Sequence, residues 1–185
     1  MEEKITYFEK VGKANTPQVL ALVKERAKER GIRKVVLAST RGETARAAAE
    51  VFKGTGVQLV VVPWQFGFGE KYGAGDPFPQ ELVAELASQG HRTHFSTMLF
   101  HTDDLYGIKI PQAMANLLRI FGQGTKVCIE IIMMACDGGC IGTGEKVIAT
   151  SGTGSGADTA MVVTAAASSK MTQLKVHEII CKPLL

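Results

Sequence analysis

The sequence lacks the features that would place it in a membrane or on a secretory route. Its 185 residues contain no run of about 18 uninterrupted apolar residues, the length that a membrane-spanning helix needs. The first residues, Met1 to Lys4, are mostly charged and are not followed by the apolar stretch of a secretory signal. We therefore expect a cytoplasmic protein with no membrane partner.

Positive charge and aromatic residues are also too sparse for a nucleic-acid surface. The formal net charge is +3, and the densest basic group, between Lys24 and Lys34, is interrupted by acidic residues as on a solvated helix face. Nucleic-acid binding favours a basic stripe with interleaved aromatic side chains, and aromatic residues make up only 6% of this chain. We expect no nucleic-acid partner.

Cysteine is scarce, and its spacing fits no metal or redox motif. The chain has four cysteines, at positions 128, 136, 140 and 181. Three residues separate Cys136 from Cys140, whereas thioredoxin-type motifs and zinc knuckles have two. We expect reduced thiols that behave as small apolar side chains, with no disulfide framework and no bound metal.

The chain does contain an alternation of short apolar runs and helical segments. Strands are predicted at residues 34–38, 57–62, 92–96, 146–150, 159–165 and 174–181, after an extended piece at 5–8. Helices are predicted at residues 43–53, 79–88 and 111–121, and between Thr16, which can cap a helix, and Gly31, which can end one. Strand–helix–strand units of this length have parallel strands, and the helix-poor last third favours an antiparallel edge. We expect one α/β domain over residues 1–185.

Residues 126–137 fit either a strand or a helix. Their valine and isoleucines favour a strand. The polar residues Lys126, Glu130 and Asp137, however, are spaced by four and seven, which aligns them on one stripe of an otherwise apolar helix. We therefore predict a helix.

Two loops that follow buried strands are rich in glycine and hydroxyl side chains. The first, residues 39–44, opens a helix whose unpaired N–H groups and dipole favour an anion. Ser39, Thr40 and Thr44 add hydroxyl donors, and Gly42 lets the backbone approach an anion closely. The loop is therefore a candidate phosphate site.

The second loop, residues 151–159, alternates glycine with serine and threonine and suits a nest of N–H groups around phosphate oxygens. Neither loop matches the Gly-x-x-x-x-Gly-Lys-Ser/Thr motif or the Gly-x-Gly-x-x-Gly fingerprint. A capped turn and a flexible hairpin are thus the alternative interpretations. The candidate ligand-binding residues of the second loop are Gly152, Thr153, Gly154, Ser155, Gly156, Asp158 and Thr159.

Together the loops carry a resemblance to a known domain. VVLASTRGETARAAAEVF (35–52) and KVIATSGTGSGADTAMVV (146–163) resemble the phosphate loop and the Gly-rich effector loop of the C-terminal domain of pyruvate kinase. FGQGTKVCIE (121–130) and GADT (156–159) are similar to a family of free-standing proteins made of this domain alone. The resemblance runs from about Thr6 to Pro183. It implies a three-layer, mostly parallel sheet of order 3-2-1-4-5 with the fifth strand reversed, and both loops at one crevice.

Two departures limit what the resemblance implies. The family often has Arg in the Gly-rich loop where this chain has Ser155, and Arg41 is the candidate to supply that charge. The resemblance covers only the regulatory domain of pyruvate kinase, so we expect no kinase activity to carry over.

The long loop at residues 63–77 supplies aromatic side chains that would lie above the same crevice. Trp64, Phe66 and Phe68 can stack on a flat ring, and Gln65 and Gly67 join the candidate site. The resemblance makes flavin mononucleotide the favoured ligand. The alternative is that these aromatics fill the core of their own loop.

A second group of polar residues follows the third helix. His91, His94, His101, Asp103 and Asp104 are close in sequence, but their spacing matches no established metal pattern, so capping and surface roles are favoured. Glu130, on a predicted buried helix, fits either a general base or a partner of a lysine.

These patterns favour a binding or sensor protein for a phosphorylated metabolite. A flavin-dependent redox enzyme and a ligand-free scaffold that acts through oligomer contacts are the alternatives. No nucleophile–base–orienter set is visible that would define a reaction. Whether the chain forms a homo-oligomer stays open.

Overall fold

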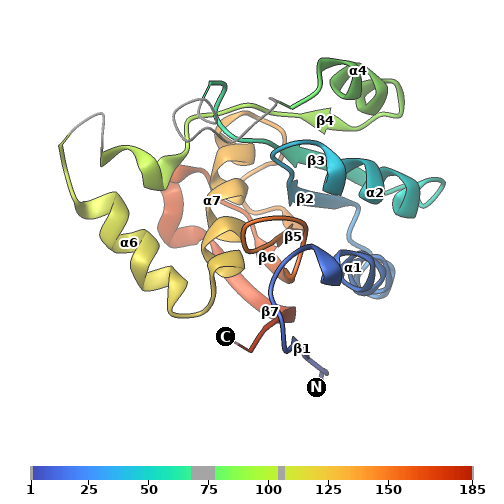
Figure 1. The fold of residues 1–185 in the computed structure, drawn as a ribbon, viewed down its shortest axis with the longest axis horizontal. Helices are drawn as coiled ribbons and strands as arrows, with labels where there is room; N and C mark the ends of the chain where they lie inside the picture. Colours follow the sequence, from blue (N-terminus) through green and yellow to red (C-terminus); the bar gives the residue numbers. More distant parts are fainter. Residues whose placement is uncertain (1, 68–77, 104–106, 185) are drawn as a thin grey trace.

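The computed structural model describes residues 2–67, 78–103 and 107–184, and its strands form one sheet with helices on both faces (Figure 1). Within the described residues the sheet has seven strands in the order β1-β7-β6-β5-β2-β3-β4. Their bounds are β1 Thr6–Phe8, β2 Lys34–Ala38, β3 Gln58–Val62, β4 Arg92–Thr93, β5 Lys146–Ser151, β6 Thr159–Thr164 and β7 Lys175–Pro183.

The five-strand order that the resemblance implied is confirmed. Strands β4, β3, β2 and β5 are parallel neighbours, and β6 pairs with β5 in the antiparallel sense. Beyond β6 the sheet continues: β7 pairs antiparallel with β6, and β1 pairs parallel with β7. Strand β4 is shorter than predicted, because only Val60 and Val61 of β3 find partners in it.

Helices cover both faces of the sheet and bury a separate apolar core on each. Strand β2 shows why: Val35 and Leu37 face one core, and Val36 between them faces the other. The first core holds α1 (Thr16–Arg30), α2 (Glu43–Phe52) and α4 (Gln80–Ser88); the second holds α6 (Ile110–Arg119) and α7 (Gln123–Asp137). No helix in the described part of the chain is long and apolar enough to cross a membrane.

Helix α7 settles the ambiguous segment in favour of a helix, which begins at Gln123, before the predicted start. It packs against β5, β2 and β6 through residues that are almost all buried. An added Cβ at Gly124 would lie 2.1 Å from Thr159 Oγ1. The N-terminal turn of α7 can therefore approach β6 closely only because this residue has no side chain.

The prediction that Thr16 caps α1 is wrong. Asn15 holds the N-cap position without a capping side-chain hydrogen bond. The Thr16 hydroxyl instead accepts the N–H of Ala157, at 2.9 Å, from the Gly-rich loop. At the other end, Gly31 ends α1 in the left-handed conformation, as predicted.

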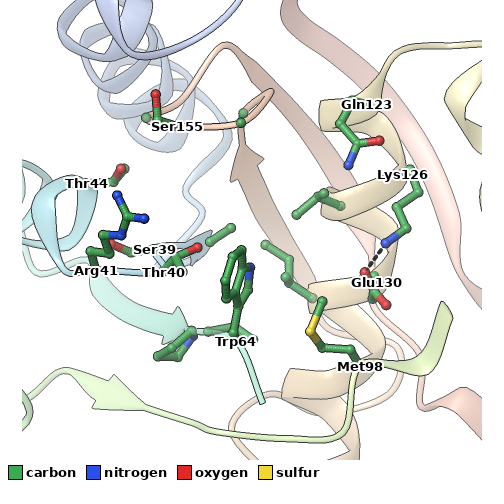
Figure 2. Close-up of a pocket in the computed structure, with 18 of the residues that line it drawn as sticks. Ser39, Thr40, Arg41, Thr44, Trp64, Met98, Gln123, Lys126, Glu130 and Ser155 are labelled. Atoms are coloured by element: carbon green, nitrogen blue, oxygen red, sulfur yellow. Dashed lines mark hydrogen bonds and ion pairs between the residues drawn. The ribbon is translucent and has the colours of Figure 1, made fainter. Parts of the chain in front are cut away.

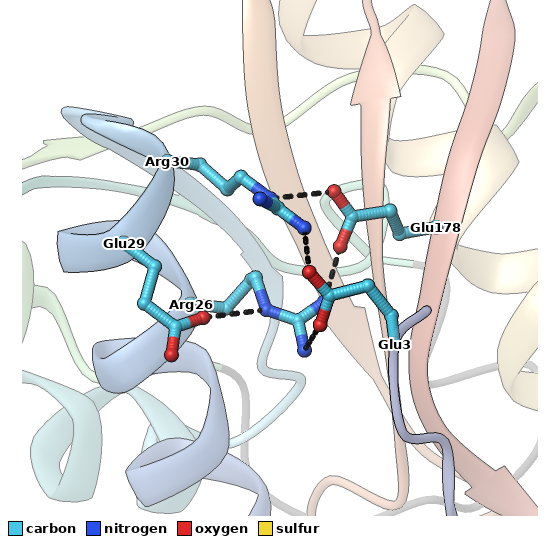
Figure 3. A network of polar contacts seen from close by, with 5 residues as sticks. All are labelled: Glu3, Arg26, Glu29, Arg30 and Glu178. Carbon is cyan, nitrogen blue, oxygen red and sulfur yellow. Dashed lines mark hydrogen bonds and ion pairs between the residues drawn. The ribbon is translucent and has the colours of Figure 1, made fainter. Parts of the chain in front are cut away.

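A charged network joins α1 to the antiparallel side of the sheet (Figure 3). Arg26 is only 8% exposed and contacts Glu3, Glu29 and Glu178. Arg30 contacts Glu3 and Glu178, with 2.8 Å between its Nε and Glu178 Oε1. The segment before β1, helix α1 and strand β7 are thus held by shared carboxylates.

We expect Glu178→Gln to lower the free energy of unfolding by about 1–2 kcal/mol at pH 7, because two arginines lose a charged acceptor. Burial acts to raise the pKa of Glu178, but hydrogen bonds from Arg30 and Arg26 outweigh it and hold this pKa below the usual range. Such a carboxylate stabilises the fold above its unfolded pKa of about 4.3, and the gain is lost as pH falls through the folded pKa. The difference between wild type and variant in urea unfolding should therefore shrink below about pH 4.

Glu29→Gln is the matched control, because the Glu29 side chain is 48% exposed and contacts Arg26 alone among the charged groups of this network. It should change the unfolding free energy by less than about 1 kcal/mol. Equal losses in the two variants, or a loss from Glu178→Gln that does not depend on pH, would contradict the network's role.

Candidate functional site

A cavity of about 300 Å³ lies where the strand order reverses, between the carboxyl ends of β2 and β5. Its walls come from both predicted loops, from the start of the loop after β3, from residues near Met98 and from α7 (Figure 2). The lining residues are Ala38, Ser39, Thr40, Arg41, Glu43, Thr44, Val62, Pro63, Trp64, Met98, His101, Gln123, Lys126, Val127, Glu130, Ile131, Met134, Gly152, Gly154, Ser155 and Gly156.

The first loop presents the start of α2 to this cavity. The N–H groups in the first turn of a helix have no acceptor within the helix. The buried Ser39 hydroxyl accepts a hydrogen bond from the N–H of Ala45 at 3.1 Å. Glu43 and Thr44, which precede Ala45, line the cavity, so their N–H groups are the donors that this helix start offers. The arrangement suits an oxyanion.

A buried carboxylate shapes the second loop. Asp158 is fully buried and accepts hydrogen bonds from the N–H of Gly12 at 2.9 Å, the N–H of Thr153 at 3.0 Å and the Thr159 hydroxyl at 2.8 Å. The loop is thus fixed both to itself and to the segment before α1. Asp158, Thr153 and Thr159, which were predicted as ligand contacts, hold the loop together through these hydrogen bonds and do not line the cavity.

The two glycines at the tip of this loop differ in their surroundings. An added Cβ at Gly156 would lie 2.3 Å from Lys13 Cα, so this glycine permits the contact with the N-terminal segment. Gly154, with φ of 77°, has no atom within 4 Å of an added Cβ and borders the cavity. A side chain at Gly154 is therefore strained at the backbone, and it enters open space.

The third wall carries a buried ion pair. Lys126 is 1% exposed and Glu130 is 3% exposed, and 2.5 Å separates Nζ from Oε2. Burial lowers the pKa of Lys126, although the Glu130 carboxylate opposes that shift. Burial acts to raise the pKa of Glu130, but contacts with His101, Lys126 and the Phe100 N–H lower it below its usual range. Of the two interpretations of Glu130, the lysine partner holds.

Neighbouring groups fix this pair in place. The Phe100 N–H donates to Glu130 Oε1 at 2.8 Å, and His101 Nδ1 lies 3.5 Å from the same oxygen. Lys126 Nζ lies 5.4 Å from the centroid of the Phe100 ring, within the range of a cation–π contact. The carboxylate of Glu130 is therefore engaged on both oxygens.

The predicted site residues divide into two groups. The cavity gathers eight of them: Ser39, Thr40, Arg41, Thr44, Gly152, Gly154, Ser155 and Gly156. The other seven lie outside its lining: Gly42, Gln65, Phe66, Gly67, Thr153, Asp158 and Thr159. Phe66 is 71% exposed and meets Phe95 edge-on, with 5.7 Å between ring centroids, whereas Trp64 does line the cavity. Phe68 lies outside the described residues.

Sequence reasoning missed the α7 wall. Lys126 and Gln123 of α7 line the cavity but were not among the candidates, and neither was Met98, which precedes α6. The i,i+4 spacing of Lys126 and Glu130 on an apolar helix was the available signal. Its interpretation needs the position of α7 beside β5, because the same stripe on another face would point into solvent.

Two residues of the histidine-rich stretch, His91 and Asp103, make hydrogen bonds that serve the fold. His91 Nδ1 accepts the Leu59 N–H at 3.3 Å, in line with burial that lowers its pKa. The Asp103 carboxylate accepts the N–H of Gln112, in the first turn of α6, at 3.3 Å, which agrees with the predicted capping role. His101 alone of the stretch lines the cavity, and Asp104 lies outside the described residues.

The cysteines are free thiols, and Cys128, Cys140 and Cys181 are buried. Burial raises the pKa of Cys128 and Cys181 to about 12 and that of Cys136 to about 11. Thiols with such pKa values stay protonated near neutral pH and are poor nucleophiles. The interpretation of the cysteines as apolar side chains agrees with this.

No protein-family model matches the sequence. In structure the chain is similar to pyruvate kinase. A pyruvate kinase of Cryptosporidium parvum in complex with ADP matches over 89% of this chain and 24% of its own length, at 12% identity and a TM-score of 0.40. A second pyruvate kinase structure from that organism matches over 73% and 20%, at 14% identity and a TM-score of 0.37.

The chain therefore spans a quarter or less of the length of these two kinases. Sequence identities of 12% and 14% indicate a similarity of fold alone.

We expect Asp158→Asn to destabilise the protein by at least about 2 kcal/mol, because an amide replaces a buried charged acceptor of three hydrogen bonds. Urea unfolding followed by Trp64 fluorescence measures the loss. Ser155→Ala, on the exposed tip of the same loop, should stay within about 0.5 kcal/mol of wild type. Similar values for the two variants would contradict the structural role of Asp158.

Proposed function

We propose that the cavity binds a phosphate-bearing small molecule with its phosphate between the two loops, and that flavin mononucleotide is the favoured ligand. The protein would act as a sensor or regulatory protein for it. The observation that carries this proposal is the convergence of the α2 start and the Gly-rich loop on one cavity. Two sets of backbone donors that face one space suit the several oxygens of a phosphate.

The phosphate end has the donors that a phosphate needs. Thr44 and Ser155 bring hydroxyl groups from opposite loops, and Arg41 brings a positive charge at the exposed rim. This position is consistent with Arg41 supplying the positive charge that the family's arginine provides at the position of Ser155. Hydrogen bonds to a charged phosphate are about twice as strong as those between neutral groups.

The rest of the cavity suits a flat ring. Trp64 lies between the loop residues and α7 in Figure 2, and Met98 and Val127 add apolar surface. An aromatic side chain and a thioether are both favourable neighbours for a planar aromatic ligand. The volume of about 300 Å³ is at the lower end of the range of about 300–1,000 Å³ for small-molecule sites.

Mass spectrometry of small molecules released from the purified protein tests the ligand's identity. A phosphorylated ligand, flavin mononucleotide first, is the expected result. A phosphate-free ligand in stoichiometric amount would contradict the proposal.

Mutation of the two loops tests the binding mode. We expect Thr44→Ala and Ser155→Ala each to weaken flavin mononucleotide about ten- to a hundredfold, since each removes a hydrogen bond to a charged acceptor, about 1.5–3 kcal/mol. The double variant should lose less than the product of the two factors, because both groups hold one phosphate. Fluorescence titration of the flavin measures the affinities.

Thr153→Ala is the matched control on the Gly-rich loop. Its side chain does not line the cavity, so affinity should change less than twofold. Riboflavin, which lacks the phosphate, should bind more weakly than flavin mononucleotide and should be insensitive to Thr44→Ala. Strictly multiplicative losses in the double variant, or a large effect of Thr153→Ala, would show that the two loops do not share the phosphate.

A further inference from the structure

The α7 wall places a buried charge pair at the end of the cavity opposite the phosphate loops (Figure 2). A buried ion pair that served only stability would gain little, because taking two charges out of water offsets most of their attraction. Lys126 and Glu130 are buried, yet both border an open cavity rather than a closed core. The position of the pair therefore suggests contact with a bound molecule.

Of the two groups, Lys126 is the one with donors to offer. Glu130 already accepts two hydrogen bonds, one from Lys126 at Oε2 and one from the Phe100 N–H at Oε1. An ammonium has three N–H donors. Among the contacts of the described residues, Lys126 Nζ directs one donor to Glu130 and has a face toward the Phe100 ring. A further N–H is left for an acceptor in the cavity.

The charge balance of the wall decides what kind of acceptor fits. The two charges of the Lys126–Glu130 pair balance each other, so a second carboxylate or phosphate here would add a negative charge beside Glu130 that Lys126 does not compensate. A neutral carbonyl oxygen accepts the Lys126 donor without that penalty. The apolar stretch of Trp64, Met98 and Val127 between the two polar ends fits the flat ring that would carry this oxygen.

We propose that Lys126, positioned by Glu130, donates a hydrogen bond to a ring carbonyl of the ligand and so selects carbonyl-bearing flat rings whose phosphate sits in the loops. This inference rests on the proposed function and adds a specificity-determining residue to it. Lys126 contacts the ligand, and Glu130 acts only through Lys126.

A double variant, Lys126→Met with Glu130→Gln, tests the inference without leaving a buried charge unpaired. Affinities for three probes are measured by calorimetry: flavin mononucleotide, riboflavin and inorganic phosphate. We expect both flavins to bind at least tenfold more weakly and inorganic phosphate to bind unchanged. Unchanged flavin affinity in a folded variant would overturn the inference and leave the phosphate site intact. An equal loss for inorganic phosphate would also overturn it.

The matched control is Lys34→Met with Glu145→Gln. This Lys–Glu pair has a similar separation, 2.9 Å from Nζ to Oε1, but its side chains are 28% and 33% exposed and lie outside the cavity. It should leave all three affinities unchanged, and losses matching those of the cavity pair would contradict the inference. Wild-type protein that binds inorganic phosphate but neither flavin would overturn the inference alone. Failure with all three probes would overturn the proposed function as well.

The inference can also be tested on the wild-type protein by comparing its affinities for two nucleotides. Inosine monophosphate and adenosine monophosphate share a phosphate and a flat purine, but the first has a ring carbonyl where the second has an amino group. The inference predicts that inosine monophosphate binds at least threefold more tightly. Equal affinities, or tighter binding of adenosine monophosphate, would overturn it.

Discussion

Backbone pairing between β2 and β5 brings together two loops that are far apart in the sequence. Val35, Val36 and Leu37 pair in parallel with Ile148, Ala149 and Thr150, so both strands end at the same edge of the sheet. From β2 the chain continues to β3 and β4 on one side, while β5 leads to β6 on the other. The cavity lies at this edge, where the strand order reverses.

The position of the Gly-rich loop depends in turn on the N-terminal segment. Gly12 donates to Asp158, Thr16 accepts from Ala157, and Gly156 lies against Lys13. The loop is therefore fixed by contacts far from it in sequence, despite its three glycines. The loop does connect the antiparallel neighbours β5 and β6, as a hairpin loop does, and these contacts hold it against the N-terminal segment. A preorganised loop loses less entropy when it binds a ligand.

The sequence predicted those parts of the fold that local patterns determine. Strands β2 and β3 were located within a residue of their ends, because short apolar runs rich in β-branched residues favour strands over helices. Helix α7 followed from the spacing of Lys126 and Glu130. The resemblance, rather than periodicity, supplied the strand order.

What the sequence did not predict depends on contacts between distant segments. The Thr16 hydroxyl could cap α1 or accept a hydrogen bond from a distant segment. The position of Ala157, whose N–H it accepts, determines that it does the second. Asp158 and Thr159 resemble ligand contacts in a Gly-rich loop, but the Gly12 N–H and the start of α7 turn them inward. Lys126 looked like part of a polar stripe, and its burial follows only from where α7 lies on the sheet.

The two ends of the cavity differ in their electrostatics, and under the proposed function this difference would favour one orientation of the ligand. At the loops, helix N–H groups, hydroxyls and the exposed Arg41 provide positive potential that a phosphate can satisfy while it stays near water. At α7 the positive charge of Lys126 is already balanced by Glu130, and both groups are buried. A phosphate moved to that end would lose its hydration and gain no net opposite charge. Under the proposed function, the same molecule turned the other way would bind less well, so the cavity would distinguish the two ends of the proposed ligand by charge.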